Sequence, residues 1–228
     1  MTRTLCVIPA RGGSKGIPRK NLADCAGKPL IAWTIEQALA VPELDVVVST
    51  EDAEIGTVAA DHGAGVLWRP PELAEDTTAT EPVVEHAVLT RIEEGRRPDR
   101  VMLLQATSPV RRPGTLARAL AELDASGADS LVGVVPQAPF LWWAPRTADD
   151  SPRADYDVDA RPRRQDLTPQ TYRYRETGSL YVTRTEVYLE HHNRLGGRIH
   201  LFVMDEVEGV DIDTPHDLEV AAHLLTTP

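Results

Sequence analysis

The chain has 228 residues, of which 42% are hydrophobic and 26% are charged, and these values suit one globular domain without disordered or repetitive tracts. Its formal net charge of -11 argues against nucleic acid as the main partner, because phosphate backbones are bound by an excess of Lys and Arg. No apolar run is long enough to cross a bilayer and the first residues lack the pattern of a signal peptide, so we expect a cytoplasmic protein without a membrane partner.

Short β-branched runs alternate with amphipathic stretches through the first 135 residues, which is the pattern of βαβ units around a buried parallel sheet. Helical spacing of apolar residues predicts helices at residues 28–40, 80–95 and 113–126. Strands are predicted at residues 4–9, 44–49, 65–68, 100–105 and 130–136. We therefore expect an α/β fold of three layers, with a mostly parallel sheet flanked by helices.

The pattern changes between residues 137 and 176, where five prolines interrupt the chain and charged and aromatic residues replace the βα alternation. Strand-like runs resume at residues 178–183 and 198–204, and residues 214–225 have the spacing of a closing helix. A domain boundary is one interpretation, but this is too little regular structure for a second core. We predict a single domain over residues 1–228, with residues 137–176 as an inserted arm.

A Gly-rich basic loop follows the first predicted strand: residues 8–21 read Ile-Pro-Ala-Arg-Gly-Gly-Ser-Lys-Gly-Ile-Pro-Arg-Lys-Asn. Its glycines let the backbone approach a ligand closely. Its cations supply hydrogen-bond donors and positive charge for a polyphosphate, and they are Arg11, Lys15, Arg19 and Lys20. The loop matches neither the Walker pattern nor the dinucleotide fingerprint, and a flexible basic loop is the alternative interpretation. At the carboxyl end of a first strand, we expect it to bind phosphate.

Together with Asn21, this loop resembles the opening signature of the acylneuraminate cytidylyltransferases, the family that makes CMP-activated sialic and related sugars. Further similarities follow in order along the chain, at residues 48–52 (Val-Ser-Thr-Glu-Asp), 69–77 (Arg-Pro-Pro-Glu-Leu-Ala-Glu-Asp-Thr), 104–111 (Leu-Gln-Ala-Thr-Ser-Pro-Val-Arg), 163–167 (Arg-Arg-Gln-Asp-Leu) and 211–214 (Asp-Ile-Asp-Thr). These motifs span nearly the whole chain. The resemblance implies a Rossmann-like nucleotidyltransferase fold and CTP as one substrate.

Gln105 ends an apolar strand, and its amide offers donors and an acceptor to one edge of a pyrimidine. Thr107, Ser108 and Arg111 follow in the next turn, where a nucleotide would lie, although a helix cap is the alternative for the two hydroxyls. We expect Arg11 and Lys15 to be catalytic, because they would neutralise charge at the reacting phosphates. The complete predicted nucleotide-binding set is Ala10, Arg11, Gly12, Gly13, Ser14, Lys15, Lys20, Asn21, Arg69, Gln105, Thr107, Ser108 and Arg111.

Asp211 and Asp213 flank Ile212 in a stretch that reads as extended chain, which would put both carboxylates on one side and the isoleucine toward the core. Mg²⁺ typically takes one or two carboxylates and completes its shell with phosphate oxygens and water. Asp211 and Asp213 are therefore the predicted ligands of a Mg²⁺ cofactor. A helix N-cap is the alternative role for Asp213, because Thr214 and a proline follow it.

The arm and the strand after it are rich in arginine and tyrosine, which suits an acceptor with a carboxylate and many hydroxyls: Arg161, Arg163, Arg164, Arg173, Arg175, Tyr172, Tyr174 and Tyr181. A guanidinium pairs with a carboxylate in bidentate geometry, so one or more of these arginines could hold an acidic sugar. Gln165, Arg173 and Tyr181 are the residues that we expect to bind the acceptor.

The sequence departs from the family pattern in three places. Glu51 stands where Asp is common, Thr177 replaces the Asn of a frequent Asn-Gly pair, and residues 140–143 (Phe-Leu-Trp-Trp) hold no lysine. These changes leave the half of the chain expected to bind CTP intact. They put the identity of the sugar in doubt more than the reaction.

The resemblance and the motifs predict transfer of CMP from CTP to a nonulosonic acid of the sialic or legionaminic acid type, with release of pyrophosphate. CMP transfer to the eight-carbon sugar Kdo or to a phosphonate is the alternative within enzymes, and a non-catalytic CTP-binding regulator is the alternative outside them. The apolar run at residues 140–143 is unlikely to remain in water on a soluble monomer. We therefore expect a homodimer in which each arm crosses to the other chain and helps to close its acceptor pocket. The alternative is that the two tryptophans pack onto their own sheet and the arm is a surface loop.

Overall fold

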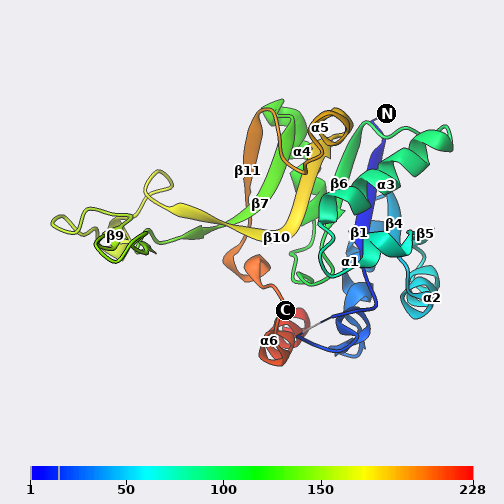
Figure 1. Ribbon diagram of the computed structural model, residues 1–228, viewed down its shortest axis with the longest axis horizontal. Coiled ribbons are helices and arrows are strands. Elements are labelled where there is room, and N and C mark those ends of the chain that lie inside the picture. The colour runs from blue at the N-terminus through cyan, green and yellow to red at the C-terminus, as the bar shows by residue number, and fades with distance from the viewer. Residues whose placement is uncertain (1, 15, 228) are drawn as a thin grey trace.

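The sheet at the centre of the protein is built around β1, a strand that is apolar and buried on both faces. The structure, a computed structural model, describes residues 2–14 and 16–227. The sheet has seven strands in the order β11-β7-β10-β6-β1-β4-β5 (Figure 1). Their bounds are Thr4–Pro9 (β1), Leu44–Thr50 (β4), Gly65–Trp68 (β5), Arg100–Leu104 (β6), Ser130–Gln137 (β7), Arg173–Arg184 (β10) and Ile199–Val203 (β11).

The sheet is mostly parallel, as the sequence predicts. β1 pairs in parallel with β4 and β6, β4 with β5, and β7 with β11. β10 is antiparallel to both of its neighbours, β6 and β7. β1 and β6 are buried on both faces, and such strands read as continuous apolar runs. β1 and the edge strand β5 have the predicted bounds, and β4, β6 and β7 differ from theirs by one residue. β10 is longer than predicted because it continues into the arm past a register shift between Glu176 and Tyr181.

Helices cover both faces of the sheet, which gives the expected three layers. On one face, α1 (Leu30–Leu39), α2 (Ala53–Asp61) and α4 (Thr115–Ser126) pack their apolar residues against the sheet. On the other face, α3 (Thr80–Glu93) and α5 (Thr185–His191) do the same. The sequence interpretation did not include α2 and α5, which are the two shortest of these helices.

The predicted first helix begins two residues late because the chain forms a short hairpin before it. β2 (Asp24–Cys25) pairs antiparallel with β3 (Lys28–Pro29), so α1 starts at Leu30.

The closing helix α6 (Pro215–Thr226) packs in a third apolar cluster, which Ile17 and Ile212 join. This cluster holds the carboxyl end of the chain against the Gly-rich loop. Within the described residues, no helix combines the length and the apolar character needed to cross a bilayer.

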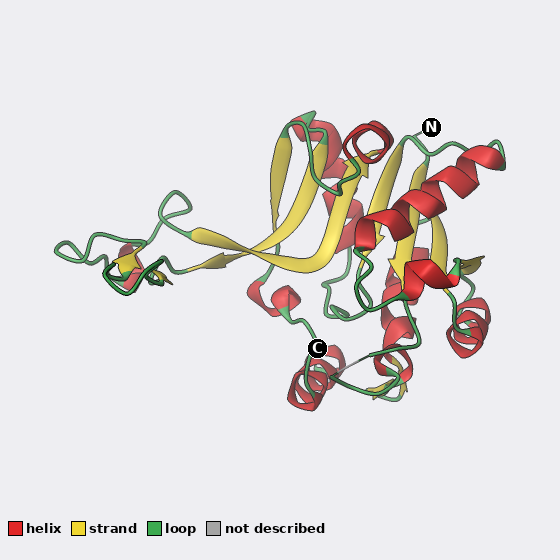
Figure 2. Ribbon diagram, viewed as in Figure 1, coloured by secondary structure: helices red, strands yellow, loops and turns green. Residues whose placement is uncertain are grey.

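Residues between β7 and β10 protrude from the body of the molecule. Figure 2 shows these two strands continuing as a twisted ribbon that leads to the protrusion. At its end, β8 (Trp142–Trp143) pairs antiparallel with β9 (Arg153–Ala154), and a short 3-10 helix, η3 (Arg164–Asp166), follows. The rings of Phe140 and Tyr156 pack edge to face, and the Arg161 guanidinium lies over both rings.

Candidate active site

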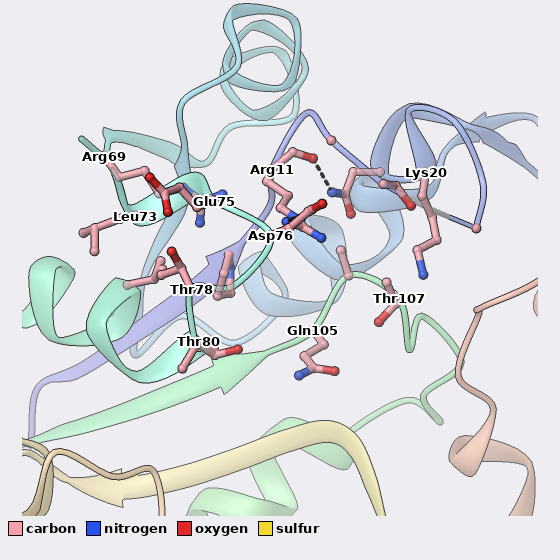
Figure 3. Close-up of a pocket in the computed structure, with 18 of the residues that line it drawn as sticks. Arg11, Lys20, Arg69, Leu73, Glu75, Asp76, Thr78, Thr80, Gln105 and Thr107 are labelled. Carbon is pink, nitrogen blue, oxygen red and sulfur yellow. Dashed lines mark hydrogen bonds and ion pairs between the residues drawn. The ribbon is translucent and has the colours of Figure 1, made fainter. Parts of the chain in front are cut away.

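A cleft of about 450 Å³ opens at the carboxyl ends of the parallel strands, the place where open α/β sheets bind ligands. Four parts of the chain line it: the Gly-rich loop after β1, the segment between β5 and α3, the turn after β6, and Asp213. Figure 3 shows Gln105 facing Arg11 and Asp76 across the cleft, with Arg69 on one side and Lys20 on the other.

Most of the predicted nucleotide-binding residues meet in this cleft although they are far apart in the sequence. Those that line it are Arg11, Gly13, Ser14, Lys20, Asn21, Arg69, Gln105 and Thr107, together with the predicted metal ligand Asp213. Lys15 lies outside the described residues. The structure thus brings the phosphate loop, the predicted base-reading amide and one metal carboxylate into one cavity.

The Gly-rich loop is tied to the carboxyl-terminal segment on one side. The Lys20 ammonium donates to the carbonyl oxygen of Ile212 at 2.6 Å, and a side chain at Gly16 would collide with the carbonyl oxygen of Asp213. The Asn21 amide closes the loop on itself by donating to the carbonyl oxygen of Arg11 at 3.0 Å. These contacts explain why a glycine stands at position 16 and why Asn21 follows the loop.

On its other side, the loop is held by the turn between β4 and α2. The backbone N–H of Gly12 donates to Glu51 Oε1 at 2.8 Å, and a side chain at Gly12 would collide with Asp52. Arg19 pairs with Asp52 and, at 2.6 Å, with Glu54. This guanidinium also holds the pKa of the Asp52 carboxyl below its usual range. The Gly12 amide and the Arg19 charge, which the sequence assigns to a ligand, are thus engaged by the protein itself.

Each of the three basic side chains that line the described part of the cleft is paired with a carboxylate. Arg11 Nη1 lies 2.5 Å from Asp76 Oδ1, and Lys20 Nζ lies 3.3 Å from Asp213 Oδ1. The third pair joins Arg69 Nη2 to Glu51 Oε2 at 2.8 Å. The carboxylates of Asp76 and Asp213 are 51% and 80% exposed, and ion pairs open to solvent contribute about 0–1 kcal/mol, so a triphosphate can replace these two carboxylates. The Arg69 side chain is only 3% exposed, and its pair is the exception.

Gln105 lies against a glycine that leaves room for its side chain. A Cβ atom on Gly178 would come within 2.9 Å of Gln105 Oε1, and Gly178 has a φ of 71°, in the region that favours glycine. This is where β10 shifts register against β7. The Thr177-Gly178 pair, which the sequence marks only as a departure from the family, therefore shapes the wall beside the predicted base-reading amide.

Three residues predicted to contact the nucleotide are buried and do not line the cleft, so their side chains support it from behind. Arg111 is 8% exposed and donates to Gln37 Oε1 at 2.9 Å and to the carbonyl oxygen of Ser179 at 2.7 Å. Burial lowers the pKa of its guanidinium to about 10. Ser108 is fully buried and donates to Asp211 Oδ1 at 3.1 Å, and Ala10 is 2% exposed.

None of the three predicted acceptor residues lines the cleft of its own chain. Gln165 lies in η3 on the protrusion, and Arg173 pairs there with Asp155 at 2.5 Å. Tyr181 is 3% exposed in the core beneath α3 and α5, and its hydroxyl donates to Glu176. Burial raises the pKa of the Tyr181 hydroxyl well above its usual range. An acceptor site built from these three residues is therefore not assembled within one chain.

The predicted metal ligands have the expected alternation. Ile212 is fully buried, whereas the carboxylates of Asp211 and Asp213 are exposed on either side of it. The N-cap of α6 is Thr214, which forms a capping box with Asp217, so Asp213 is free of that role. No group of three or more His, Cys, Asp or Glu side chains that could hold a metal occurs among the described residues. Of the two aspartates only Asp213 lines the cleft. One or two carboxylates still fit Mg²⁺ if a bound triphosphate and water supply its remaining ligands.

The sequence interpretation missed part of the cleft wall. The segment between β5 and α3 contributes Leu73, Glu75, Asp76 and Thr78, and α3 contributes its first residue, Thr80. The available signal was the conspicuous stretch at residues 69–77, of which only Arg69 was assigned a role. Asp76 is the most informative of these residues, because it holds Arg11 in the free protein.

We expect Arg111→Met to lower the free energy of unfolding by about 2–4 kcal/mol, because it leaves buried acceptors on Gln37 and Ser179 without a donor. Denaturant unfolding measures this loss, and the affinity of the folded variant for CTP should change less than about threefold. Arg112→Met is the matched control, since the Arg112 side chain is 53% exposed. A variant of normal stability that binds CTP poorly would return Arg111 to the ligand site.

Comparison with known proteins agrees with this site. A family model described as cytidylyltransferase matches residues 5–191. The chain is 35% identical over 217 residues to N-acylneuraminate cytidylyltransferase B of Danio rerio, covering 94% of this chain and 49% of that protein. It is 33% identical over 232 residues to the pseudaminic acid cytidylyltransferase of Campylobacter jejuni, covering 96% and 94%.

The chain thus spans about half the length of the Danio rerio relative and nearly all of the Campylobacter jejuni one. Among solved structures, a CMP:2-keto-3-deoxy-manno-octonic acid synthetase in complex with CTP has a TM-score of 0.68. This likeness covers 98% of each chain at 20% identity and therefore concerns the fold. The matched family model and the two relatives show that this chain belongs to the cytidylyltransferase family, whose members are nucleotidyltransferase enzymes.

Proposed function

We propose that this chain transfers CMP from CTP to a nonulosonic acid of the sialic or legionaminic acid type and releases pyrophosphate. The observation that carries the proposal is the cleft in which the Gly-rich loop faces Gln105 and Asp213 lies beside Lys20. The names of the two relatives, for N-acylneuraminate and pseudaminic acid, support an acceptor of this chemical class.

In the proposed reaction, the anomeric hydroxyl oxygen of the sugar attacks the α-phosphorus of CTP. A new P–O bond forms there, and the bond from the α-phosphorus to the bridging oxygen of the pyrophosphate breaks. Arg11 and Lys20 would leave Asp76 and Asp213 to hold the phosphates, since both carboxylates are exposed to solvent. Lys15, outside the described residues, would join them. Binding and charge neutralisation supply most of the catalysis in such a step.

The assay that tests the proposal measures pyrophosphate release from CTP with a panel of acceptors: N-acetylneuraminate, legionaminate, pseudaminate, Kdo and 2-aminoethylphosphonate. We expect turnover with one or more of the three nine-carbon acids. Arg11→Ala should then lower the rate by about two orders of magnitude, as removal of a charge-stabilising donor does elsewhere. Turnover with Kdo or the phosphonate alone would shift the proposal to that acceptor, and binding of CTP without turnover on any acceptor would indicate a regulator.

Mg²⁺ is part of the proposal, and Asp211 and Asp213 are the residues that would hold it. When bound, the ion would neutralise charge on the phosphates. We expect Asp213→Asn to raise the Mg²⁺ concentration needed for half-maximal rate by about tenfold or more, because an anionic oxygen ligand is lost. Glu219→Gln, on the exposed side of α6, is the control. An unchanged Mg²⁺ titration would show that the Asp213 carboxylate does not hold the ion.

A homodimer is also part of the proposal, and the protrusion supports it. Trp142 and Trp143 are 57% and 59% exposed there, and an apolar patch of this kind gains by being covered. Arms that cross between two copies would bring Gln165 and Arg173 of one chain toward the cleft of the other, where the acceptor site of a single chain is incomplete. A two-fold contact is the commonest way to bury a self-complementary patch.

Light scattering should give a mass of about 50 kDa, twice the chain mass of 25.0 kDa. Trp142→Ser combined with Trp143→Ser should shift the protein toward monomer, because both exposed rings are removed from the contact. A wild-type mass near that of one chain would defeat the dimer. A dimer that survives the double substitution would place the contact on another surface.

A cytoplasmic location completes the proposal. Cys6 and Cys25 are both buried and free in the structure, which fits the reducing conditions of the cytoplasm.

A further inference from the structure

Glu51 does not line the cleft itself, but its carboxylate contacts two parts of the chain that form the cleft. It follows β4 directly, and its two oxygens bind two different parts of the cleft. Oε1 accepts the backbone N–H of Gly12 at 2.8 Å. Oε2 accepts Arg69 Nε at 3.0 Å and Arg69 Nη2 at 2.8 Å. One side chain therefore joins the Gly-rich loop after β1 to the segment that follows β5, two strands away in the sheet.

The Glu51–Arg69 pair differs from the other two ion pairs of the cleft in its burial. The side chains of Arg69 and Glu51 are 3% and 24% exposed. Those of Arg11 and Asp76 are 32% and 51% exposed, and those of Lys20 and Asp213 are 15% and 80% exposed, so each of these two pairs has an exposed carboxylate. Separating a buried pair leaves a guanidinium without its counter-charge, which costs far more than opening an exposed pair. A ligand can thus draw Arg11 from Asp76, whereas Arg69 stays on Glu51.

The geometry of these contacts fixes orientation as well as position. Two nitrogens of Arg69 bind one carboxylate oxygen, and the backbone N–H of Arg69 donates to the carbonyl oxygen of Thr50 at 3.1 Å. The plane of the guanidinium is therefore held while Arg69 lines the cleft. On the other oxygen, Gly12 directly precedes Gly13 and Ser14, which line the cleft as well. A shift of the Glu51 side chain would move the Gly-rich loop and Arg69 together.

We propose that Glu51 is a positioning residue for the triphosphate of CTP, which sets the spacing between the Gly-rich loop and Arg69. The inference rests on the proposed function, since it assigns a role within that site. Glu51 neutralises the charge of Arg69, so that the guanidinium serves as an oriented hydrogen-bond donor to the phosphates. Arg11 and Lys20 supply the positive charge that neutralises the phosphates. Glu51 acts through Gly12 and Arg69 and need not touch CTP.

Two substitutions separate the charge of Glu51 from its reach. Glu51→Gln keeps the length and the oxygen that accepts from Gly12, but it loses the charge that holds Arg69. Glu51→Asp keeps the charge, but it is one methylene shorter and cannot reach both partners from the same backbone. We expect each variant to lower kcat/KM for CTP by about ten- to a hundredfold, as displacement of a positioned group does. KM for the acceptor should change less than about twofold.

A double-mutant cycle with Arg69→Gln shows whether Glu51 acts through Arg69. The effect of Glu51→Gln on kcat/KM for CTP should be smaller in the Arg69→Gln background than in the wild type, because the shared contact is already gone. Glu94→Gln is the matched control, since it breaks pairs with Arg91 and Arg96 on the surface far from the site. Denaturant unfolding of every variant confirms that kinetics are measured on folded protein.

Wild-type protein is first tested for CTP binding with Mg²⁺, and failure of that step would defeat the proposed function instead of the role of Glu51. Given binding, a folded Glu51→Gln with normal kcat/KM for CTP would overturn the inference, and so would strictly additive effects in the cycle. If Glu51→Gln does not fold, Glu51→Asp decides by the same two criteria. A selective loss in kcat/KM for CTP, with coupling to Arg69, would support it.

Discussion

An acidic protein can hold a triphosphate only where it concentrates positive charge locally. In the absence of the ligand, that charge must be balanced by nearby carboxylates. The chain carries a formal net charge of -11, yet its cleft gathers Arg11, Lys20 and Arg69 within one cavity. Each of them is paired with a carboxylate, on Asp76, Asp213 and Glu51 respectively. The repulsion among the three cations is thereby compensated in the free protein. The rest of the site follows from which of these pairs can open.

The fold serves this arrangement by bringing distant segments to one edge of the sheet. The carboxyl ends of β1 and β6 carry the Gly-rich loop and Gln105, and the segment after β5 adds Arg69. Ile212 anchors the carboxyl-terminal aspartates by sinking into the cluster that α6 forms with the loop. The backbone of Ile212 also donates to Thr107 at 2.9 Å, which ties that cluster to the turn after β6. The Gly-rich loop, the turn after β6 and the segment that carries Asp213 are therefore held together.

Local patterns were enough to predict the sheet and much of the cleft. Apolar runs gave β1 and β5 their bounds, and alternation around Ile212 put the two aspartates in solvent, as the structure shows. The burial of Arg111 could not be predicted in the same way, because its acceptors on Gln37 and Ser179 come from α1 and β10. Tyr181 is likewise buried by core residues of α3 and α5, which its own position in the sequence does not reveal. The side chains whose burial the sequence did not predict are those whose neighbours come from several elements.

The structure of the complex with CTP and Mg²⁺ would test the account most directly, since CTP has no acceptor to react with in such crystals. The account predicts that Arg11 leaves Asp76 and Lys20 turns from Asp213 to contact the phosphates. It also predicts that both Glu51 contacts, to Gly12 and to Arg69, persist unchanged. A complex in which Arg69 separates from Glu51 to hold the phosphates, while Arg11 stays on Asp76, would contradict it.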